Sequence, residues 1–229
     1  MTSVSTKLSD FRYERKFFIS DLTSHEVEAI IKLHPAIISE IYYPRYVNNI
    51  YLDSFAMNSY FDNVDGVADR IKVRIRWYGD MFGVIEKPVL EFKIKRGLVG
   101  RKESFPLKSF SIDEHLQLDC IVDLFDRSDI PADLRLNLGA VEASLINRYR
   151  RKYFLSADKR YRITIDTELT FCPVEKARFL HKYVDYASTV LEVKYHPEDN
   201  RQVTRITSHF PFRMTRSSKY VNGIDLAYL

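Results

Sequence analysis

Hydrophobic and polar residues alternate along many short segments of this chain, which is the pattern of β-strands with one buried face. The first such segment, residues 11–19, places Arg12, Glu14 and Lys16 on one face. The most regular segment lies at residues 70–77, where one face carries four basic residues, Arg70, Lys72, Arg74 and Arg76. The alternation therefore predicts strands that each carry one apolar and one charged face.

The same pattern continues to the end of the chain. It predicts further strands at residues 46–53, Val89–Arg96, 101–107, 141–155, 161–167 and Thr189–Tyr195, with a last short segment at 217–220. Helices are fewer. Thr23 and Glu26 have the spacing of a capping box that opens a helix reaching about His34. Helical periodicity also predicts helices at residues 55–63 and 111–126, and the end of a short helix at 179–181.

These elements define the fold class. About eight strands with few helices predict an α+β protein dominated by an antiparallel sheet. The chain shows no internal repeat and no Pro/Gly/Ser-rich linker, so we expect a single domain over residues 1–229.

Composition restricts the function classes. Hydrophobic residues make up 45% of the 229 residues, enough for a folded core, and only 7 glycines argue against Gly-rich nucleotide-binding loops. No signal-peptide stretch is present, and no segment approaches the roughly 18 apolar residues of a membrane span. We therefore expect a soluble, cytoplasmic protein. Cys120 and Cys172 lack the CxxC spacing, and we expect reduced core thiols.

The sign of the charges changes this picture more than the net charge of +4 does. Rows of basic residues on neighbouring strands repel one another unless an anion lies between them. If the sheet closes into a barrel, these rows converge on its interior. Acidic residues that can hold a metal ion there or near it are Glu14, Glu91, Asp166, Glu168 and Glu192. The solvated face of an open sheet gives the same alternation, and from composition alone that interpretation is favoured, because charge runs usually lie on the surface.

Several segments decide between them by resemblance. RIRWYG at residues 74–79 resembles the signature strand of the polyphosphate-polymerase domain of the vacuolar transporter chaperone (VTC) family. The same family is resembled, in order, by RYERKFFI at 12–19, NIYLDS at 49–54, LEFKIKRG at 90–97, YRRKYF at 149–154, RITIDTEL at 162–169, LEVKY at 191–195 and SKYVNGI at 218–224. That family belongs to the triphosphate tunnel metalloenzymes, together with the CYTH phosphatases and cyclases.

The resemblance implies a fold and an activity. It implies an antiparallel eight-stranded β-barrel, the triphosphate tunnel, with flanking helices. It also implies an enzyme that binds ATP and polyphosphate and transfers the γ-phosphate of ATP to a growing polyphosphate chain, with Mn²⁺ or Mg²⁺ as cofactor. The N-terminal regulatory domain and membrane-spanning segment of fungal relatives are not expected here, although association with a membrane partner is compatible with the family.

The resemblance also implies roles for individual residues. The implied catalytic residues are Arg74, Arg76, Lys93, Arg151 and Arg162. The implied phosphate ligands are Lys16, Lys95, Tyr149, Ser218 and Lys219. The implied metal ligands are Glu192 and Glu14. A slip of one residue would exchange Arg151 for Arg148 or Arg150 at the tunnel wall.

Three alternatives stay open. The same bore serves a triphosphatase that hydrolyses polyphosphate or nucleoside triphosphate, because only the nucleophile differs. A tunnel that binds polyphosphate without turnover is another. Basic β-surfaces with aromatic residues also bind nucleic acid, but the aromatic residues lie mostly opposite the basic rows, so no nucleic acid is expected. Trp77 and Tyr78 are accordingly expected to pack in the core and at the rim rather than to stack on bases.

Overall fold

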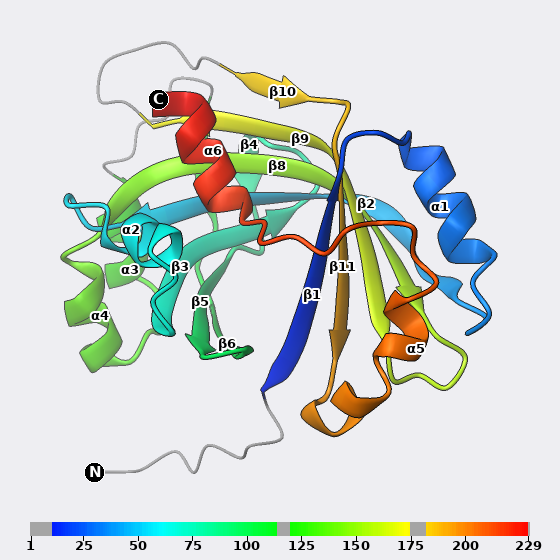
Figure 1. Cartoon of the computed structure of the whole chain (residues 1–229). Helices are drawn as coiled ribbons and strands as arrows, with labels where there is room; N and C mark the ends of the chain where they lie inside the picture. The colour runs from blue at the N-terminus through cyan, green and yellow to red at the C-terminus, as the bar shows by residue number, and fades with distance from the viewer. Residues whose placement is uncertain (1–10, 114–119, 175–181, 229) are drawn as a thin grey trace.

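The structure, a computed structural model, describes residues 11–113, 120–174 and 182–228. An antiparallel sheet of nine strands dominates it (Figure 1). The strands are β1 (Arg12–Ile19), β2 (Ser39–Asp53), β3 (Asp69–Tyr78), β5 (Val89–Arg96), β6 (Val99–Pro106), β8 (Glu142–Leu155), β9 (Arg162–Pro173), β10 (Tyr183–Asp185) and β11 (Thr189–Tyr195).

Eight of these strands close into a ring. Their order is β9, β11, β1, β6, β5, β3, β2, β8, and β8 then pairs again with β9. The short β10 extends the sheet beside β9 without entering the ring. Pairing is extensive at most joints, such as Tyr13–Ile19 of β1 against β11, but only Arg12 and Tyr13 pair with β6. The predicted eight-stranded antiparallel architecture is confirmed, with one lightly bonded joint.

Shorter elements cover the outside of the ring. They are the two-stranded sheet of β4 (Gly83–Ile85) and β7 (Phe110–Ile112), the helices α1 (Ser24–Lys32), α3 (Cys120–Asp126), α4 (Ala132–Leu138) and α5 (Thr204–Thr207), and the 3₁₀ helix η2 (Pro197–Arg201). The remaining helices, α2 (Asn58–Val64) and α6 (Lys219–Tyr228), contact each other at one end of the ring. Helix α1 starts at the predicted capping box, where Thr23 and Glu26 bond each other's backbone N–H. Within the described residues, no helix has the length and apolar character needed to cross a membrane.

Two sequence predictions differ from the structure, and a third is not tested by it. The predicted helix at 111–126 begins instead with strand β7, because Phe110 and Ile112 are buried around an exposed Ser111, which is the two-residue period of a strand. The later part of the prediction agrees with α3. The segment 217–220, counted with the strands, instead leads into α6. The predicted helix end at 179–181 lies outside the described residues.

The apolar faces of the ring strands point outward, against the covering elements. One core cluster packs Trp77, Leu90 and Ile146 of the ring against α3 and α4, and a second packs Phe17, Ile163 and Val193 against α1 and α5. Because the apolar face is used on the outside, the alternate residues of each strand face the interior. The charged rows are therefore enclosed.

Helix α6 packs against the inner, apolar end of the ring. Tyr220 and Ile224 of α6 join a third cluster with Leu145 of β8 and Phe171 of β9. Gly223 makes this approach possible, since a Cβ atom there would lie 2.4 Å from Leu145 Cδ2 and 2.6 Å from Phe171 Cδ1. This contact places Lys219, the first residue of α6, beside the charged rows.

The cysteine prediction is confirmed for Cys172, a buried free thiol whose pKa burial raises to about 11. The side chain of Cys120 lies outside the description.

Candidate functional site

Charged side chains from non-adjacent strands meet inside the ring. Lys93 Nζ of β5 lies 2.9 Å from Glu14 Oε2 of β1, although β6 separates the two strands in the sheet. Arg151 Nη2 of β8 lies 3.9 Å from Glu192 Oε2 of β11, across β9. Contacts of this kind can form only through the interior. We call this interior space the bore.

Tyr149 lies at the centre of a group of cations in the bore. Its hydroxyl accepts a hydrogen bond of 3.0 Å from Arg76 Nη2. Arg151 Cζ lies 5.0 Å and Lys219 Nζ 4.8 Å from the centroid of its ring. Burial opposes ionisation of Tyr149, but Arg151 and Arg76 outweigh it and lower the pKa of Tyr149 to about 8. Three basic side chains thus converge on one buried aromatic ring.

Arg74 and Arg76 share one buried carboxylate. Arg74 donates to Glu91 Oε2 from Nε at 2.8 Å and from Nη2 at 2.7 Å, and Arg76 Nη1 lies 3.6 Å from the same oxygen. Lys102 Nζ takes the other oxygen at 2.6 Å. Burial of Glu91 raises its pKa, but Arg74 and Arg76 overcome this and hold the pKa well below its usual range. Three cations on one carboxylate leave an excess of positive charge that faces the bore.

Asp166 fixes the position of two further cations. Arg151 binds it through two parallel hydrogen bonds, Nε to Oδ1 at 2.5 Å and Nη2 to Oδ2 at 2.7 Å. Lys219 Nζ lies 2.6 Å from Oδ2. The side chain of Asp166 is fully buried, so both cations are held in one geometry within the bore.

Glu14 and Glu192 form the acidic part of the site. Lys194 Nζ lies 3.7 Å from Glu14 Oε1 and 3.3 Å from Glu192 Oε2, so one ammonium group contacts both. Burial opposes the ionisation of both carboxyl groups, and the charge of Glu192 also opposes that of Glu14. Nearby lysines outweigh these effects and lower the pKa of each carboxyl. Both groups are therefore carboxylates at neutral pH.

Two carboxylates suit a divalent cation whose other ligands come from phosphate and water. The described residues contain no cluster of three His, Cys, Asp or Glu side chains able to hold a metal unaided. The hydroxyl of Thr164, which pairs in register with Glu192, is buried without a hydrogen-bond partner in this part of the chain. An oxygen without a partner next to Glu192 fits a hydrated metal ion.

The positions of two lysines in the bore disfavour the protonated form of their side chains. Burial lowers the pKa of Lys16 to about 8 and that of Lys72 to about 6. Nearby cations add to this effect, and Lys93 is one of them for both lysines. Lys72 Nζ donates to Ser218 Oγ at 2.7 Å and to Asn63 Oδ1 at 2.8 Å. Lys16 Nζ donates to the Ser217 carbonyl at 3.0 Å. An anion in the bore would relieve this repulsion.

The remaining residues implied by the sequence lie further out. Arg162 is exposed at the first position of β9 and takes part in none of the ion pairs among the described residues. Lys95 follows Lys93 on the same face of β5. Burial lowers the pKa of Lys95, and the charge of Arg70 lowers it further. The register question is answered for β8, because Arg151 faces the bore. Arg148 stacks on Tyr46 at 3.9 Å, and Arg150 pairs with Glu168 at 3.6 Å.

Sequence reasoning left Lys72 and Lys194 out of the site. Lys72 lies between Arg70 and Arg74 on the charged face of β3, so the alternation alone could have included it. Lys194 lies two residues from Glu192 on the same face of β11, which is an equally available signal.

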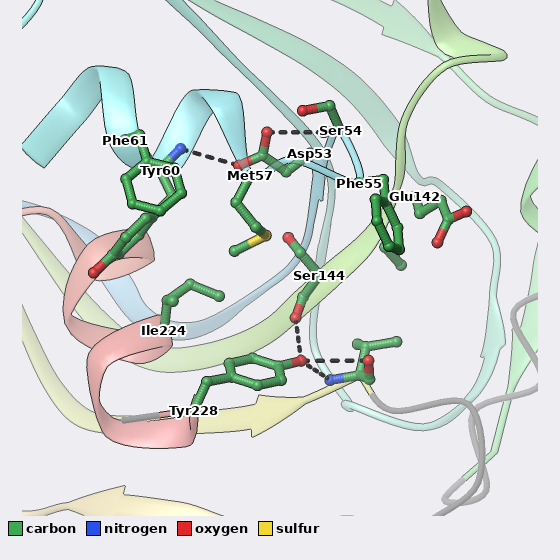
Figure 2. A pocket seen from close by; sticks show the side chains of 12 residues that line it. Asp53, Ser54, Phe55, Met57, Tyr60, Phe61, Glu142, Ser144, Ile224 and Tyr228 are labelled. Atoms are coloured by element: carbon green, nitrogen blue, oxygen red, sulfur yellow. Dashed lines mark hydrogen bonds between the residues drawn. The ribbon is translucent and has the colours of Figure 1, made fainter.

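A second cavity differs from the bore because its wall is mostly apolar. A cavity of about 470 Å³ lies between α2, α6 and the start of β8, with Phe55, Met57, Tyr60 and Ile224 in its wall (Figure 2). The carboxylate of Asp53 at this cavity accepts bonds from the backbone N–H groups of Ser54, Ser59 and Tyr60 and from the hydroxyl of Tyr220. No lysine or arginine is among the described residues that line this cavity, so it lacks the cations that phosphate binding requires.

Comparison with known proteins agrees with the geometry of the bore. The family model described as the VTC domain matches residues 11–228. No curated protein matches the chain. Among solved structures, protein PH1819 from Pyrococcus horikoshii OT3 superposes with a TM-score of 0.54 at 12% identity, covering 94% of this chain and 99% of that chain.

Two further structures share the fold. HpAC1 from Hippeastrum, described as a candidate adenylyl cyclase with a dominant triphosphatase activity, gives a TM-score of 0.51 at 13% identity, covering 96% of this chain and 97% of that chain. A candidate adenylate cyclase from Vibrio parahaemolyticus gives 0.51 at 12% identity, covering 93% and 98%. At these identities the likeness establishes a common architecture.

Proposed function

Since the chain belongs to the VTC domain family, we propose that it is a polyphosphate polymerase that transfers the γ-phosphate of ATP to a polyphosphate chain held in the bore. The observation that carries this proposal is the convergence of Arg76, Arg151 and Lys219 around Tyr149. Rigid donors held within a buried space stabilise the charge that develops on phosphate oxygens during transfer.

The proposed reaction asks the protein to position two polyanions. An oxygen of the terminal phosphate of the chain forms a bond to the γ-phosphorus, while the bond between the γ-phosphorus and its bridging oxygen breaks and ADP leaves. Arg74, Arg76 and Arg151 would bind the non-bridging oxygens through their forked guanidinium groups. Lys16, Lys93 and Lys219 would add charge as point donors. No side chain needs to act as a nucleophile.

We propose that Glu192 and Glu14 hold the Mn²⁺ or Mg²⁺ ion. When bound, the ion supplies charge neutralisation to the phosphate oxygens and orients them. The protein's own task is to keep both carboxylates ionised, which the surrounding lysines accomplish by lowering their pKa values. Thr164 would contact a water in this part of the bore, since its buried hydroxyl has no partner among the described residues.

A triphosphatase is the second candidate. The specific observation in its favour is that HpAC1, which shares the fold, is described as having a dominant triphosphatase activity. In that reaction water would take the place of the terminal phosphate, and the same cations would bind the substrate.

Product analysis separates these functions. The purified chain is incubated with ATP and Mn²⁺, and ADP, polyphosphate and orthophosphate are measured. We expect ADP together with polyphosphate. Orthophosphate as the only new phosphate product would assign a triphosphatase. No turnover, combined with a rise in melting temperature on adding long-chain polyphosphate, would assign a binding protein.

A further inference from the structure

Aromatic rings and one arginine form a layered group where β2, β3 and β8 reach the rim of the bore. Arg45 Cζ lies 4.1 Å from the centroid of the Tyr78 ring and 4.9 Å from that of Tyr153. Arg45 Nε also donates a hydrogen bond of 3.1 Å to the Tyr153 hydroxyl. Tyr42 meets Tyr153 edge to face, with the ring centroids 5.8 Å apart. We call Arg45, Tyr78, Tyr153 and Tyr42 the rim stack.

From this group we infer that the rim stack binds the base of a nucleoside triphosphate whose phosphates lie in the bore. The inference rests on the proposed function, because it takes the bore to be a phosphate site. It adds the part of the substrate that the basic residues do not address. A flat π-system is the chemistry that both tyrosine rings and a guanidinium plane recognise.

The spacing along the strands supports this arrangement. Tyr153 follows Arg151 by two residues and Tyr149 by four on the bore face of β8, which corresponds to about 7 Å and about 13 Å along a strand. On β3, Tyr78 follows Arg76 by two residues on the same face. The two strands therefore both pass from phosphate-binding cations to aromatic rings in the same order, and they end at the same rim.

The rim stack also has capacity for a ligand. Tyr78 remains 48% exposed and Tyr42 59% exposed, whereas Tyr153 beneath them is buried. Among the described residues, Arg45 donates a side-chain hydrogen bond only from Nε, so both Nη groups are available. A register irregularity in β2 between Tyr42 and Arg45 turns this segment at the rim. The rings offer faces and no set of base-edge partners, so adenine and guanine should bind comparably.

The test compares ligands that differ only in the nucleoside. Titration calorimetry with Mn²⁺ measures binding of inorganic tripolyphosphate and of the non-hydrolysable β,γ-imido analogues of ATP and GTP. For Tyr78→Ala we expect the affinity for both nucleotide analogues to fall by about fivefold or more, with tripolyphosphate affinity unchanged. Tyr78→Phe should restore binding. Tyr186→Ala, which removes an exposed tyrosine just beyond β10, is the matched control.

Each result supports or overturns the inference. Equal loss for tripolyphosphate and the nucleotide analogues, or no loss for either, overturns it while leaving the phosphate site intact. Loss of single-stranded oligonucleotide binding with unchanged nucleotide binding overturns it in favour of nucleic acid. If the wild type binds no tripolyphosphate, the proposed function fails and this inference fails with it. Tyr78→Leu replaces Tyr78→Ala if the alanine variant lowers the melting temperature, because it keeps the bulk and removes the ring.

Discussion

Arg76 and Tyr149 meet across the bore, with Nη2 donating to the hydroxyl at 3.0 Å, although β2 lies between their strands in the sheet. This contact joins two walls of the ring at the point where Arg151 and Lys219 also meet the Tyr149 ring. It also means that the ionisation of one phenol reports on the state of the bore.

Tyr149 should therefore titrate below the usual pH range of a phenol. Arg151 and Arg76 outweigh the opposing effect of burial and lower its pKa to about 8. The absorbance of tyrosinate, followed against pH, should show a step near pH 8 that Tyr149→Phe removes. Tyr153→Phe is the control and should keep the step, because burial raises the pKa of Tyr153. A step that survives in Tyr149→Phe would contradict the charge arrangement.

Glu192→Gln should abolish metal-dependent turnover and leave the fold intact. The amide keeps the shape of the side chain, but it removes a negative charge that Lys194 and Lys16 contact at 3.3 Å and 3.7 Å. Activity against Mn²⁺ concentration and the circular dichroism spectrum are the measurements. Glu168→Gln, whose carboxylate pairs with Arg150 away from the bore, should behave as wild type. Normal activity in Glu192→Gln would refute the metal assignment.

Arg76→Ala should reduce kcat by about 10²- to 10³-fold if Arg76 acts as one preorganised donor to the transition state. The matched control is Arg150→Ala, since Arg150 is exposed on the outer side of the ring. Steady-state kinetics with ATP give the comparison. An increase in KM alone, with kcat unchanged, would show that Arg76 binds ground state and transition state equally.

Arg151→Met should cost about 3 kcal/mol of folding stability, the lower end of the range for breaking a buried ion pair. The reason is that Asp166 stays buried and keeps only Lys219 as a cationic partner. Urea unfolding gives the value. Asp166→Asn combined with Arg151→Met should recover part of the loss, because the buried charge is then absent. Equal stability of the single and double variants would argue against this pairing.

Stability should rise with pH through the range in which Lys72 and Lys16 titrate. Their pKa values are lowered in the folded chain, from 10.5 to about 6 and about 8. Between about pH 6 and pH 10 the unfolded chain holds more protons, so raising the pH favours the folded state. Below pH 6 both lysines are charged in both states, and their destabilising effect is complete.

Lys72→Met tests this dependence. The variant should gain most stability relative to wild type at and below about pH 6, and its stability should depend less on pH. Lys108→Met, which alters an exposed lysine after β6, is the control. Thermal melts across the pH range give both slopes. Parallel slopes for wild type and Lys72→Met would contradict the assignment.

The alternation of apolar and charged residues was enough to predict the strands and the charge that one face of each strand carries. The four basic residues of β3 alternate with apolar ones, so one face had to be polar wherever the strand lay. The same alternation predicts a closed ring only if other elements of the chain cover the apolar outer face. Trp77 and Ile146 meet that condition through α3 and α4.

What the sequence could not supply is contact across the interior. Lys93 meets Glu14, and Arg76 meets Tyr149, through space that depends on how far each strand is shifted against its neighbour. Alternation sets a side chain's face but not its height along the bore. The rim position of Tyr78 and its partner Arg45 depend on the irregular register of β2, which has no periodic signal.

The pairing of β1 with β11 has a consequence for biosynthesis. Arg15 of β1 and Tyr195 of β11 are hydrogen-bonded although 180 residues separate them in the chain. During synthesis β1 must wait until residues Thr189–Tyr195 have been made before this partner exists, so this joint of the ring forms late. Glu14 and Lys16 enter the bore with that strand. A chain released before β11 is made would thus carry seven of the eight ring strands but could not bring Glu14 and Glu192 together, the pair that we propose holds the metal ion.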